Sequence, residues 1–350
     1  RLTDFATAIL AHAGKDAGRA AKVAARLVGA NLAGHDSHGG GMIPAYVDGI
    51  LAGQLDAAAD IELVQDKGPF LLVDGHRGFG HIVAEQAMTL AIDRAQTLHF
   101  AMLSLRNSFH LGRLGDWGIM AAEAGFICIL YANVQSVRPL VAPFGGSDAR
   151  FVTNPYCTAI PATEKHPMFV LDMATSTIAM GKARVAQLSG NPAPEGALID
   201  AQGNATRDPS VVFDGAGGAL TAFGQHKGFG LALLGDILGG SFSGGGAYAP
   251  EREVPDRIVN NMMAILIDPN VFGLAQSFGV DVDSYTDWVK ASPAAPGTAG
   301  VQFPGDPERR STAERSAKGI PLDAGTLAQL SEAARKAGVP ASEHLCSTSD

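Results

Sequence analysis

The sequence has few cysteines and no long apolar run. Only three of its 350 residues are cysteines, and Cys128, Cys157 and Cys346 stand far apart without a CxxC pair. An odd number at this spacing argues against a disulfide framework and against a zinc cage. No run of roughly 18 apolar residues exists to span a membrane, and Arg1–Asp4 lacks the layout of a secretory signal. These absences indicate a cytoplasmic protein.

Basic charge is also scarce. The chain carries 26 Lys and Arg against 35 Asp and Glu, which gives a formal net charge of −9. Because phosphate binding needs a basic surface, this balance argues against a nucleic-acid partner. The hydrophobic content of 46% is enough for a sizeable core, in one large domain or two smaller ones.

Helical periodicity dominates the first third of the chain. Phe5 and Ile9 begin one helix, which Gly14 ends, and apolar residues at helical spacing over Ala20–Asn31 predict a second. A glycine-rich loop at residues 34–39 follows, and a further helix is expected at residues 83–95.

Short apolar runs in the middle of the chain predict an α/β fold. Phe100–Leu105 and Phe126–Val134 have strand length, and a helix over residues 114–121 separates them. This β-α-β pattern implies parallel strands with a right-handed crossover. The loop Asn107–His110 would then lie at a strand's carboxyl end, where α/β proteins tend to place their sites. Phe169–Asp172 predicts another such strand, running into a helix that opens at residues 174–176.

The C-terminal part alternates apolar segments with a loop. Phe229–Leu238 is apolar almost all round and predicts a buried helix. Met262–Ile267 predicts a buried strand, and Ser292–Pro307 reads as a linker or surface loop rich in Pro, Gly and Ala. A last helix is expected over Thr326–Ala337, because Gly338 and a proline follow it.

Loop histidines are the first candidates for chemistry. His38 follows Ser37 in the glycine-flanked loop, where it could transfer protons near neutral pH or only cap a turn. His35 and His38 could instead form an H-x-x-H metal pair, but no third and fourth ligands stand nearby. Ser37, His38 and Asp172 supply the residue types of a hydrolase triad, but the G-x-S-x-G elbow is missing. A serine that orients a histidine is the stronger reading.

Two further histidines stand at element boundaries. His110 either takes part in a site or pins the Asn107–Gly112 turn. His226 precedes the predicted buried helix, where an anion could bind, or it belongs to an ordinary helix-start loop. The dinucleotide fingerprint G-x-G-x-x-G is absent, because Gly75–Gly80 does not match its spacing, and no Walker A loop occurs. The residues alone indicate an α/β enzyme with several loop histidines.

The order of several segments resembles the malate/L-lactate dehydrogenase family of the non-Rossmann type. The segments are ANLAGHDSHGGGMIPAY (30–46), NSFHLGRLGDW (107–117), APFGGSDARFVTNP (142–155) and LDMATSTIAMG (171–181), with residues 73–80, 193–209, 226–240 and 319–323. The resemblance implies the sulfolactate dehydrogenase-like α/β fold of that family, with a helical N-terminal domain. It also implies homodimers and NAD(P)-dependent interconversion of 2-oxo and 2-hydroxy acids. We therefore expect a mainly helical domain of residues 1–70 and 300–350, and an α/β domain of residues 71–299 that binds cofactor and substrate.

The resemblance implies a role for individual residues as well. His38 matches the family's proton donor, and Ser37 and Asp172 match the partners that relay and orient its charge. Thr153 lies in a block that approaches the substrate. The expected contacts to NAD or NADP are His38, His110, Gly112, Arg113, Leu114, Val170, Leu171, Asp172, Met173, Ala174, His226, Lys227, Asn260, Asp306, Pro307, Glu308 and Arg309. No metal is expected.

Three positions depart from the family's pattern without touching these roles. Phe109 stands where many members have a histidine, Val152 replaces the glycine of a GTNP motif, and Gly40 is an unusually small residue in the catalytic loop.

A fourth departure bears on the substrate. Met42 occupies the substrate position where many members carry an arginine for the carboxylate. A buried carboxylate needs a partner, so another cation is expected to serve. Arg113 is the first candidate and Arg184 the second.

Other functions stay open at this point. A metal-dependent hydrolase or lyase would use His35 and His38, and a reductase of cyclic imino acids would keep the family's redox chemistry. A cofactor-binding protein without catalysis is a further alternative, suggested by Met42 and Gly40.

Overall fold

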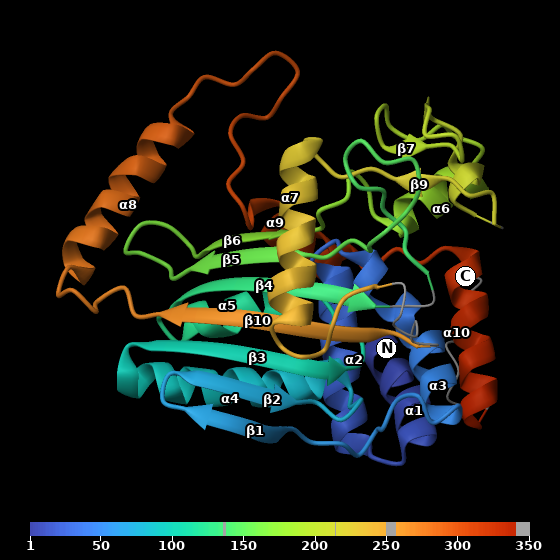
Figure 1. Ribbon diagram of the computed structural model, residues 1–350, viewed down its shortest axis with the longest axis horizontal. Coiled ribbons are helices and arrows are strands. Elements are labelled where there is room, and N and C mark those ends of the chain that lie inside the picture. Colours follow the sequence, from blue (N-terminus) through green and yellow to red (C-terminus); the bar gives the residue numbers. More distant parts are fainter. Residues whose placement is uncertain (136–137, 214, 250–256, 341–350) are drawn as a thin grey trace.

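A seven-stranded sheet forms the centre of the molecule (Figure 1). The computed structural model describes residues 1–135, 138–213, 215–249 and 257–340, so Cys346 lies outside the described residues. In spatial order the strands are β1 (Glu62–Lys67), β2 (Phe70–Asp74), β3 (Phe100–Ser108), β10 (Val259–Ile267), β4 (Ile127–Gln135), β5 (Tyr156–Ile160) and β6 (Phe169–Met173). Among the described helices, none is long and apolar enough to cross a membrane.

The predicted β-α-β unit is present, but its two strands are not neighbours. α5 (Gly115–Glu123) connects β3 to β4, and β10 lies between them and pairs antiparallel with both. β3 and β4 therefore run in the same direction, as the pattern predicts, with one antiparallel strand inserted. Local periodicity cannot reveal this insertion, because β10 arrives from a much later part of the chain.

One face of the sheet is covered by two helices with small side chains. α4 (Gly80–Leu98) packs on β3 through a row of fully buried alanines, and α5 packs on β5 and β4. Trp117 of α5 lies at the centre of this core and is fully buried. Small residues permit a close approach of helix and sheet.

The opposite face carries a helix that is less buried than its sequence predicts. α7 (His226–Leu234) crosses in front of the sheet in Figure 1 and continues as a π-helical segment, Gly235–Ser241. Burial on all sides is wrong for Phe229–Leu238: Leu233, Leu234 and Ile237 are 40%, 38% and 53% exposed. The apolar residues of this segment therefore occupy an exposed side of the helix as well as its buried side.

Helices from both ends of the chain share a second core. α1 (Leu2–Gly14), α2 (Ala17–Leu32), α3 (Ile43–Leu51) and α10 (Ala324–Ala337) lie side by side at one end of the sheet (Figure 1). Their contacts include Phe5, Ile9, Tyr46 and Leu330, each at most 3% exposed. β1, which lies within the segment 1–70 assigned to the helical domain, is instead an edge strand of the central sheet.

A small lobe that the sequence did not predict lies beside the main body. It contains the short strands β7 (Leu198–Ile199), β8 (Ala205–Thr206) and β9 (Ala219–Leu220), with α6 (Met180–Leu188). The helix expected to open at residues 174–176 begins only at Met180. Thr175 instead binds the main-chain oxygen of Thr153 through its N–H and its hydroxyl, at 2.9 Å and 2.8 Å.

The last segments run along the outside of the body. α8 (Ala275–Lys290) projects away from it in Figure 1. The loop expected at Ser292–Pro307 ends at Gly305, because its last two residues already belong to α9 (Asp306–Lys318). The final helix, α10, ends at Gly338 in a left-handed conformation, φ 79°, as the sequence predicts.

Candidate active site

The loop that carries His38 is fixed from inside by one buried side chain. The loop consists of two short 3₁₀ turns, Asp36–His38 and Gly40–Met42. Asn31, at the end of α2 and 2% exposed, donates to Asp36 Oδ1 and accepts from Gly40 N–H, each at 2.7 Å. A Cβ at Gly39 would come within 2.4 Å of the Asn31 amide, so only glycine fits there. Asn31 thus holds both turns in place, a role that its helical periodicity did not reveal.

The same loop is fixed from outside by α9. Arg315 donates to both carboxylate oxygens of Asp36, at 2.7 Å and 3.0 Å. Its guanidinium also donates to the main-chain oxygen of Asn31. A segment almost three hundred residues away therefore positions His38, and no sequence signal had indicated Arg315.

His38 is hydrogen bonded to a second predicted residue, His110. The distance between His38 Nδ1 and His110 Nε2 is 3.0 Å. The ring centroids are 5.2 Å apart and the ring planes differ by 4°, so the rings meet edge to edge in one plane. His110 Nδ1 in turn lies 2.9 Å from the hydroxyl of Tyr46, which is 3.2 Å from His81 Nδ1. Tyr46 and His81 had not been identified as site residues from the sequence.

Burial keeps the three imidazoles neutral near neutral pH. It lowers the pKa of His38 to about 4, with the positive charges of His35 and Arg113 as further causes. Burial lowers the pKa of His81 to about 3 and that of His110 well below its usual range. A neutral imidazole has one N–H and one acceptor nitrogen, so each of these rings has one donor and one acceptor.

Asp172 contacts a helix start, not His38. It stands near the end of β6, and its Oδ2 accepts from Gly115 N–H at 2.9 Å, where α5 begins. Burial raises the pKa of this carboxyl, opposed by the charge of His35 and the bond from Gly115. A Cβ at Gly115 would lie 2.7 Å from Asp172 Oδ2, so the close approach requires glycine. The expected support of His38 by Asp172 is therefore not the contact in this structure; His110 is the partner of His38.

One ion pair and one histidine–carboxylate hydrogen bond surround this cluster. Arg113 Nε and Nη2 donate to Asp116 Oδ1 at 2.8 Å and 2.5 Å, and both side chains are 11% exposed. His35 Nε2 lies 3.1 Å from Glu308 Oε1 at the start of α9. The bond with His35 lowers the pKa of Glu308. The turn at residues 306–309, predicted to contact the cofactor, is thereby joined to the His38 loop.

Asn260 on β10 has one donor that no described residue accepts from. Its Oδ1 accepts from Leu111 N–H at 2.9 Å, directly after His110. Its Nδ2 is buried and has no hydrogen-bond partner among the described residues. An unpaired buried donor costs free energy, so a ligand acceptor at this position would satisfy it. Beside it, Gly112 has φ 75°, and a Cβ there would come within 2.2 Å of His81 Nε2.

Other predicted residues lie outside this hydrogen-bonded cluster. Met42 is partly buried against the helical core, Ser37 is exposed and lies beside Gly181 at the start of α6, and Thr153 is half-buried. His226, Lys227 and Arg184 are exposed. Val170 is buried on β6, while Leu171, Met173 and Ala174 are half-buried. Arg309 donates to Asp306 and to the main-chain oxygen of Met168, which anchors the start of α9 on β6.

The two histidines of the alternative metal pair have separate partners. His35 binds Glu308 and His38 binds His110. Among the described residues, no three His, Cys, Asp or Glu side chains gather as a metal ion would require. The arrangement of these residues gives no support to the metal hydrolase alternative.

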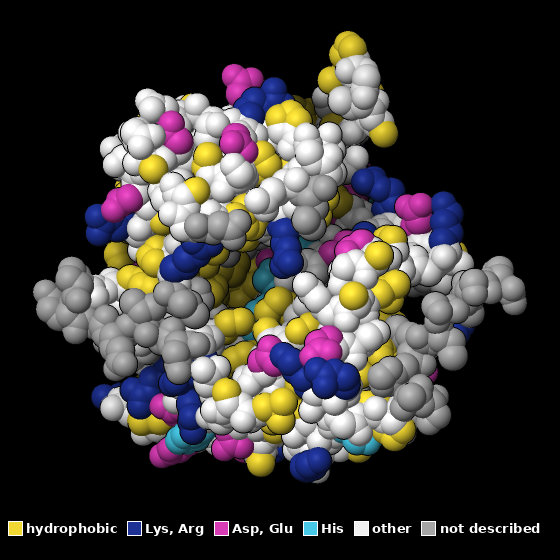
Figure 2. Space-filling view, turned by 90° about the vertical axis from the view of Figure 1, so that its right-hand side faces the viewer, with side chains coloured by type: hydrophobic (Ala, Val, Ile, Leu, Met, Phe, Trp, Pro, Cys, Tyr) yellow, Lys and Arg dark blue, Asp and Glu magenta, His cyan; other side chains and the backbone are white. Residues whose placement is uncertain are grey.

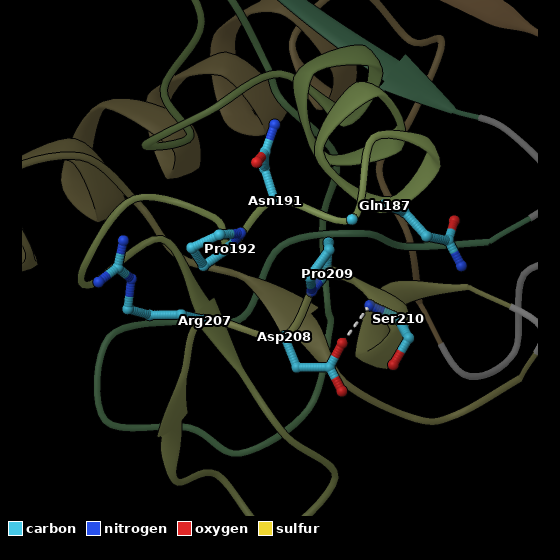
Figure 3. A pocket seen from close by; sticks show the side chains of 8 residues that line it. Gln187, Asn191, Pro192, Arg207, Asp208, Pro209 and Ser210 are labelled. Atoms are coloured by element: carbon cyan, nitrogen blue, oxygen red, sulfur yellow. Dashed lines mark hydrogen bonds between the residues drawn. The ribbon is translucent and has the colours of Figure 1, made fainter.

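The molecule is hollowed on the face shown in Figure 2. Histidine side chains are visible inside the hollow, and lysine or arginine side chains stand at its rim. A separate cavity of about 500 Å³ lies in the small lobe (Figure 3). It is lined by residues such as Pro192, Arg207 and Asp208, whose carboxylate accepts from Ser210 N–H at 2.9 Å. None of the predicted site residues lines this second cavity.

Comparison with known proteins agrees with the fold. The family model described as malate/L-lactate dehydrogenase matches residues 1–331. Hydroxycarboxylate dehydrogenase B of Escherichia coli K12 is 42% identical over 97% of this chain and 93% of its own length. L-lactate dehydrogenase of Cupriavidus necator is 39% identical over 84% of both chains. Sulfolactate dehydrogenase of Methanocaldococcus jannaschii superposes with a TM-score of 0.85 at 30% identity, covering 98% of this chain and 97% of its own. The chain belongs to the malate/L-lactate dehydrogenase family.

Proposed function

We propose that this protein interconverts 2-oxo acids and 2-hydroxy acids by hydride transfer with NAD or NADP. The names of the three relatives all refer to hydroxy acids, which carry a hydroxyl group and a carboxylate; in lactate and sulfolactate the two groups are on neighbouring carbons. The observation that carries the proposal is the His38–His110 pair in a fixed loop, next to the unpaired buried amide of Asn260. A proton-transfer group and a free donor stand together there, and a dehydrogenase needs both.

The residues present fit a nicotinamide cofactor. When bound, the nicotinamide ring would supply or accept the hydride. Its carboxamide oxygen is the type of acceptor that Asn260 Nδ2 lacks among the described residues. The half-buried end of β6 and the start of α9 are the proposed further contacts. The hydroxyl oxygen of the substrate would exchange its proton with His38, since a positioned histidine is the commonest general acid or base.

A panel of acids assayed with both cofactors tests this function. Oxaloacetate, 2-oxoglutarate, pyruvate, phenylpyruvate and a cyclic imino acid would each be mixed with NADH or NADPH, and loss of the reduced nicotinamide absorbance recorded. We expect turnover with at least one 2-oxo acid. Turnover with the imino acid alone would favour the imino acid reductase, and cofactor binding without turnover would favour a protein that lacks catalysis. No binding of either cofactor would contradict the proposal.

We further propose that the protein is a homodimer. α8, which projects from the body, and the loop before it expose large apolar side chains. Phe272 and Leu274 of the loop and Val280, Tyr285 and Trp288 of the helix are 59% to 83% exposed. Contiguous exposed apolar surface on a soluble protein marks an interaction site. Together with the open side of α7, it gives a second copy a surface to bury.

Changing this surface should separate the two copies. Light scattering is expected to give twice the 36.1 kDa chain mass for the wild type, and a mass nearer one chain for Trp288→Glu, because a carboxylate would have to be buried at the interface. Gln202→Glu is the matched control, since it adds the same charge at an exposed turn of the small lobe. A single-chain mass for active wild-type protein would contradict the proposal.

A further inference from the structure

Four side chains from four elements form a chain of hydrogen bonds that ends at His38. The Tyr46 hydroxyl lies 2.9 Å from His110 Nδ1, 3.2 Å from the main-chain oxygen of His110 and 3.2 Å from His81 Nδ1. Tyr46 is 0% exposed and His81 is 1% exposed. Solvent therefore does not supply partners for this hydroxyl.

The three contacts of the Tyr46 hydroxyl can coexist in one arrangement. A hydroxyl donates one hydrogen bond and accepts up to two. The main-chain oxygen of His110 can only accept, so it takes the single Tyr46 proton. The other two contacts then require the Tyr46 oxygen to accept from His110 Nδ1–H and from His81 Nδ1–H. Any other arrangement leaves at least one buried contact without a proton, which costs free energy.

This arrangement fixes the direction of the bond to His38. A neutral His110 with its proton on Nδ1 has a lone pair on Nε2, which faces His38 Nδ1 at 3.0 Å. His38 Nδ1 must therefore carry a proton and donate it. The remaining nitrogen of His38, Nε2, is then the one that is free to gain or lose a proton.

We infer that Tyr46 and His81 are positioning residues that hold His110 as the Nδ1–H tautomer, so that His38 exchanges protons with the substrate through Nε2. This inference rests on the proposed function. During oxidation of a hydroxy acid, His38 Nε2 would take the proton of the substrate hydroxyl, and a bound nicotinamide would supply the hydride acceptor. His38 then carries protons on both nitrogens, and its Nδ1–H still donates to His110. His110 thus does for His38 what a buried carboxylate does in a Ser-His-Asp triad, where it fixes the tautomer and orientation of the histidine.

Nitrogen NMR of the protein with ¹⁵N-labelled histidine tests the tautomers directly. The two ring nitrogens of a neutral histidine have distinct shifts when one is protonated and the other is not. We expect His81 and His110 to carry protons on Nδ1 in the protein without substrate, with the signals assigned from single-histidine variants. A proton on His110 Nε2 in the wild type would overturn the inference.

Kinetics of three variants test the consequence for His38. In Tyr46→Phe, His110 Nδ1–H loses its acceptor, so the Nε2–H tautomer competes and presents a donor to His38 Nδ1. We expect kcat to fall by about ten- to a hundredfold, the effect seen when groups that orient a metal-bound histidine are removed. The pH profile should also move to lower pH, because protonated His38 would then face a donor. His81→Leu removes one donor to the Tyr46 oxygen but leaves both Tyr46–His110 contacts, so kcat should fall less than in Tyr46→Phe. His81→Asn, whose amide can replace Nδ1–H, should keep most of the activity.

Controls separate a positioning role from simple packing. Tyr131→Phe removes another phenol hydroxyl from the sheet, outside this chain of hydrogen bonds, and should leave kcat and the pH profile unchanged. If Tyr46→Phe lowers only the melting temperature, or if His81→Asn and His81→Leu behave alike, Tyr46 and His81 do not position His110. The NMR experiment needs no substrate. If it finds the stated tautomers but no 2-oxo acid is turned over, the proposed function and the role of His38 Nε2 are rejected, and only the tautomer assignment of His110 stands.

Discussion

His38→Ala is expected to lower kcat by about 10²–10⁴-fold, the usual contribution of a positioned general acid or base. Cofactor affinity should change little, because the Asn260 amide and the start of α9 are untouched. Steady-state kinetics at saturating cofactor, together with a cofactor titration, measure both effects. Turnover like that of the wild type would remove His38 from the mechanism.

The pH dependence of the wild type follows from the low pKa of His38. Burial and the nearby positive charges lower this pKa to about 4 in the protein without ligands. Oxidation needs the neutral ring as base, so kcat/KM for a hydroxy acid should rise through this pH region and stay level towards neutral pH. Reduction needs the protonated ring, so its kcat/KM should fall as the pH rises above the same region. His38→Ala should abolish both limbs.

His35→Gln is the matched control in the same loop. It removes an imidazole that is bonded to Glu308 and not to His110. If His38 acts alone in proton transfer, His35→Gln should cost much less activity than His38→Ala. Equal losses, accompanied by loss of a bound metal ion, would support the metal-dependent alternative.

Arg113→Ala is expected to raise the KM for the 2-oxo acid by tens-fold or more. Met42 gives no cation and is packed against the helical core, so the substrate carboxylate needs another partner. Arg113 follows His110 by three residues, is nearly buried, and uses Nε and Nη2 for Asp116. Truncating one member of a buried charge pair typically costs about 2–5 kcal/mol. KM values for the acid and for the cofactor, measured in the same variant, show which ligand Arg113 contacts.

Asp116→Asn distinguishes substrate binding from the ion pair itself. This variant weakens the same pair but keeps the guanidinium. If Arg113 binds the carboxylate, Arg113→Ala raises the KM for the acid and Asp116→Asn does not. If the two variants behave alike, Arg113 only balances the charge of Asp116, and Arg184 becomes the next candidate. A higher KM for the cofactor alone would assign Arg113 to the nicotinamide dinucleotide.

The sequence by itself determined the elements whose pattern is local. The helices at residues 20–31 and 326–337 and the strand at residues 262–267 follow from apolar spacing and from glycine or proline at their ends. The order of the motifs identified the family, and loop position identified His38 and His110. The helices, the strand and the loop positions depend on residues that are neighbours in the chain, so periodicity and turn chemistry can predict them. The family was indicated only by a resemblance in the order of several motifs.

The tertiary structure alone decided which distant residues meet. β10 is inserted between β3 and β4, and α9 brings Arg315 and Glu308 to the His38 loop. Asp172 caps α5 instead of supporting His38, and Tyr46 and His81 reach His110 from separate helices. Hydrogen bonds of this kind form only when the distance between elements far apart in sequence is set to within a few tenths of an ångström. No local sequence pattern encodes that distance.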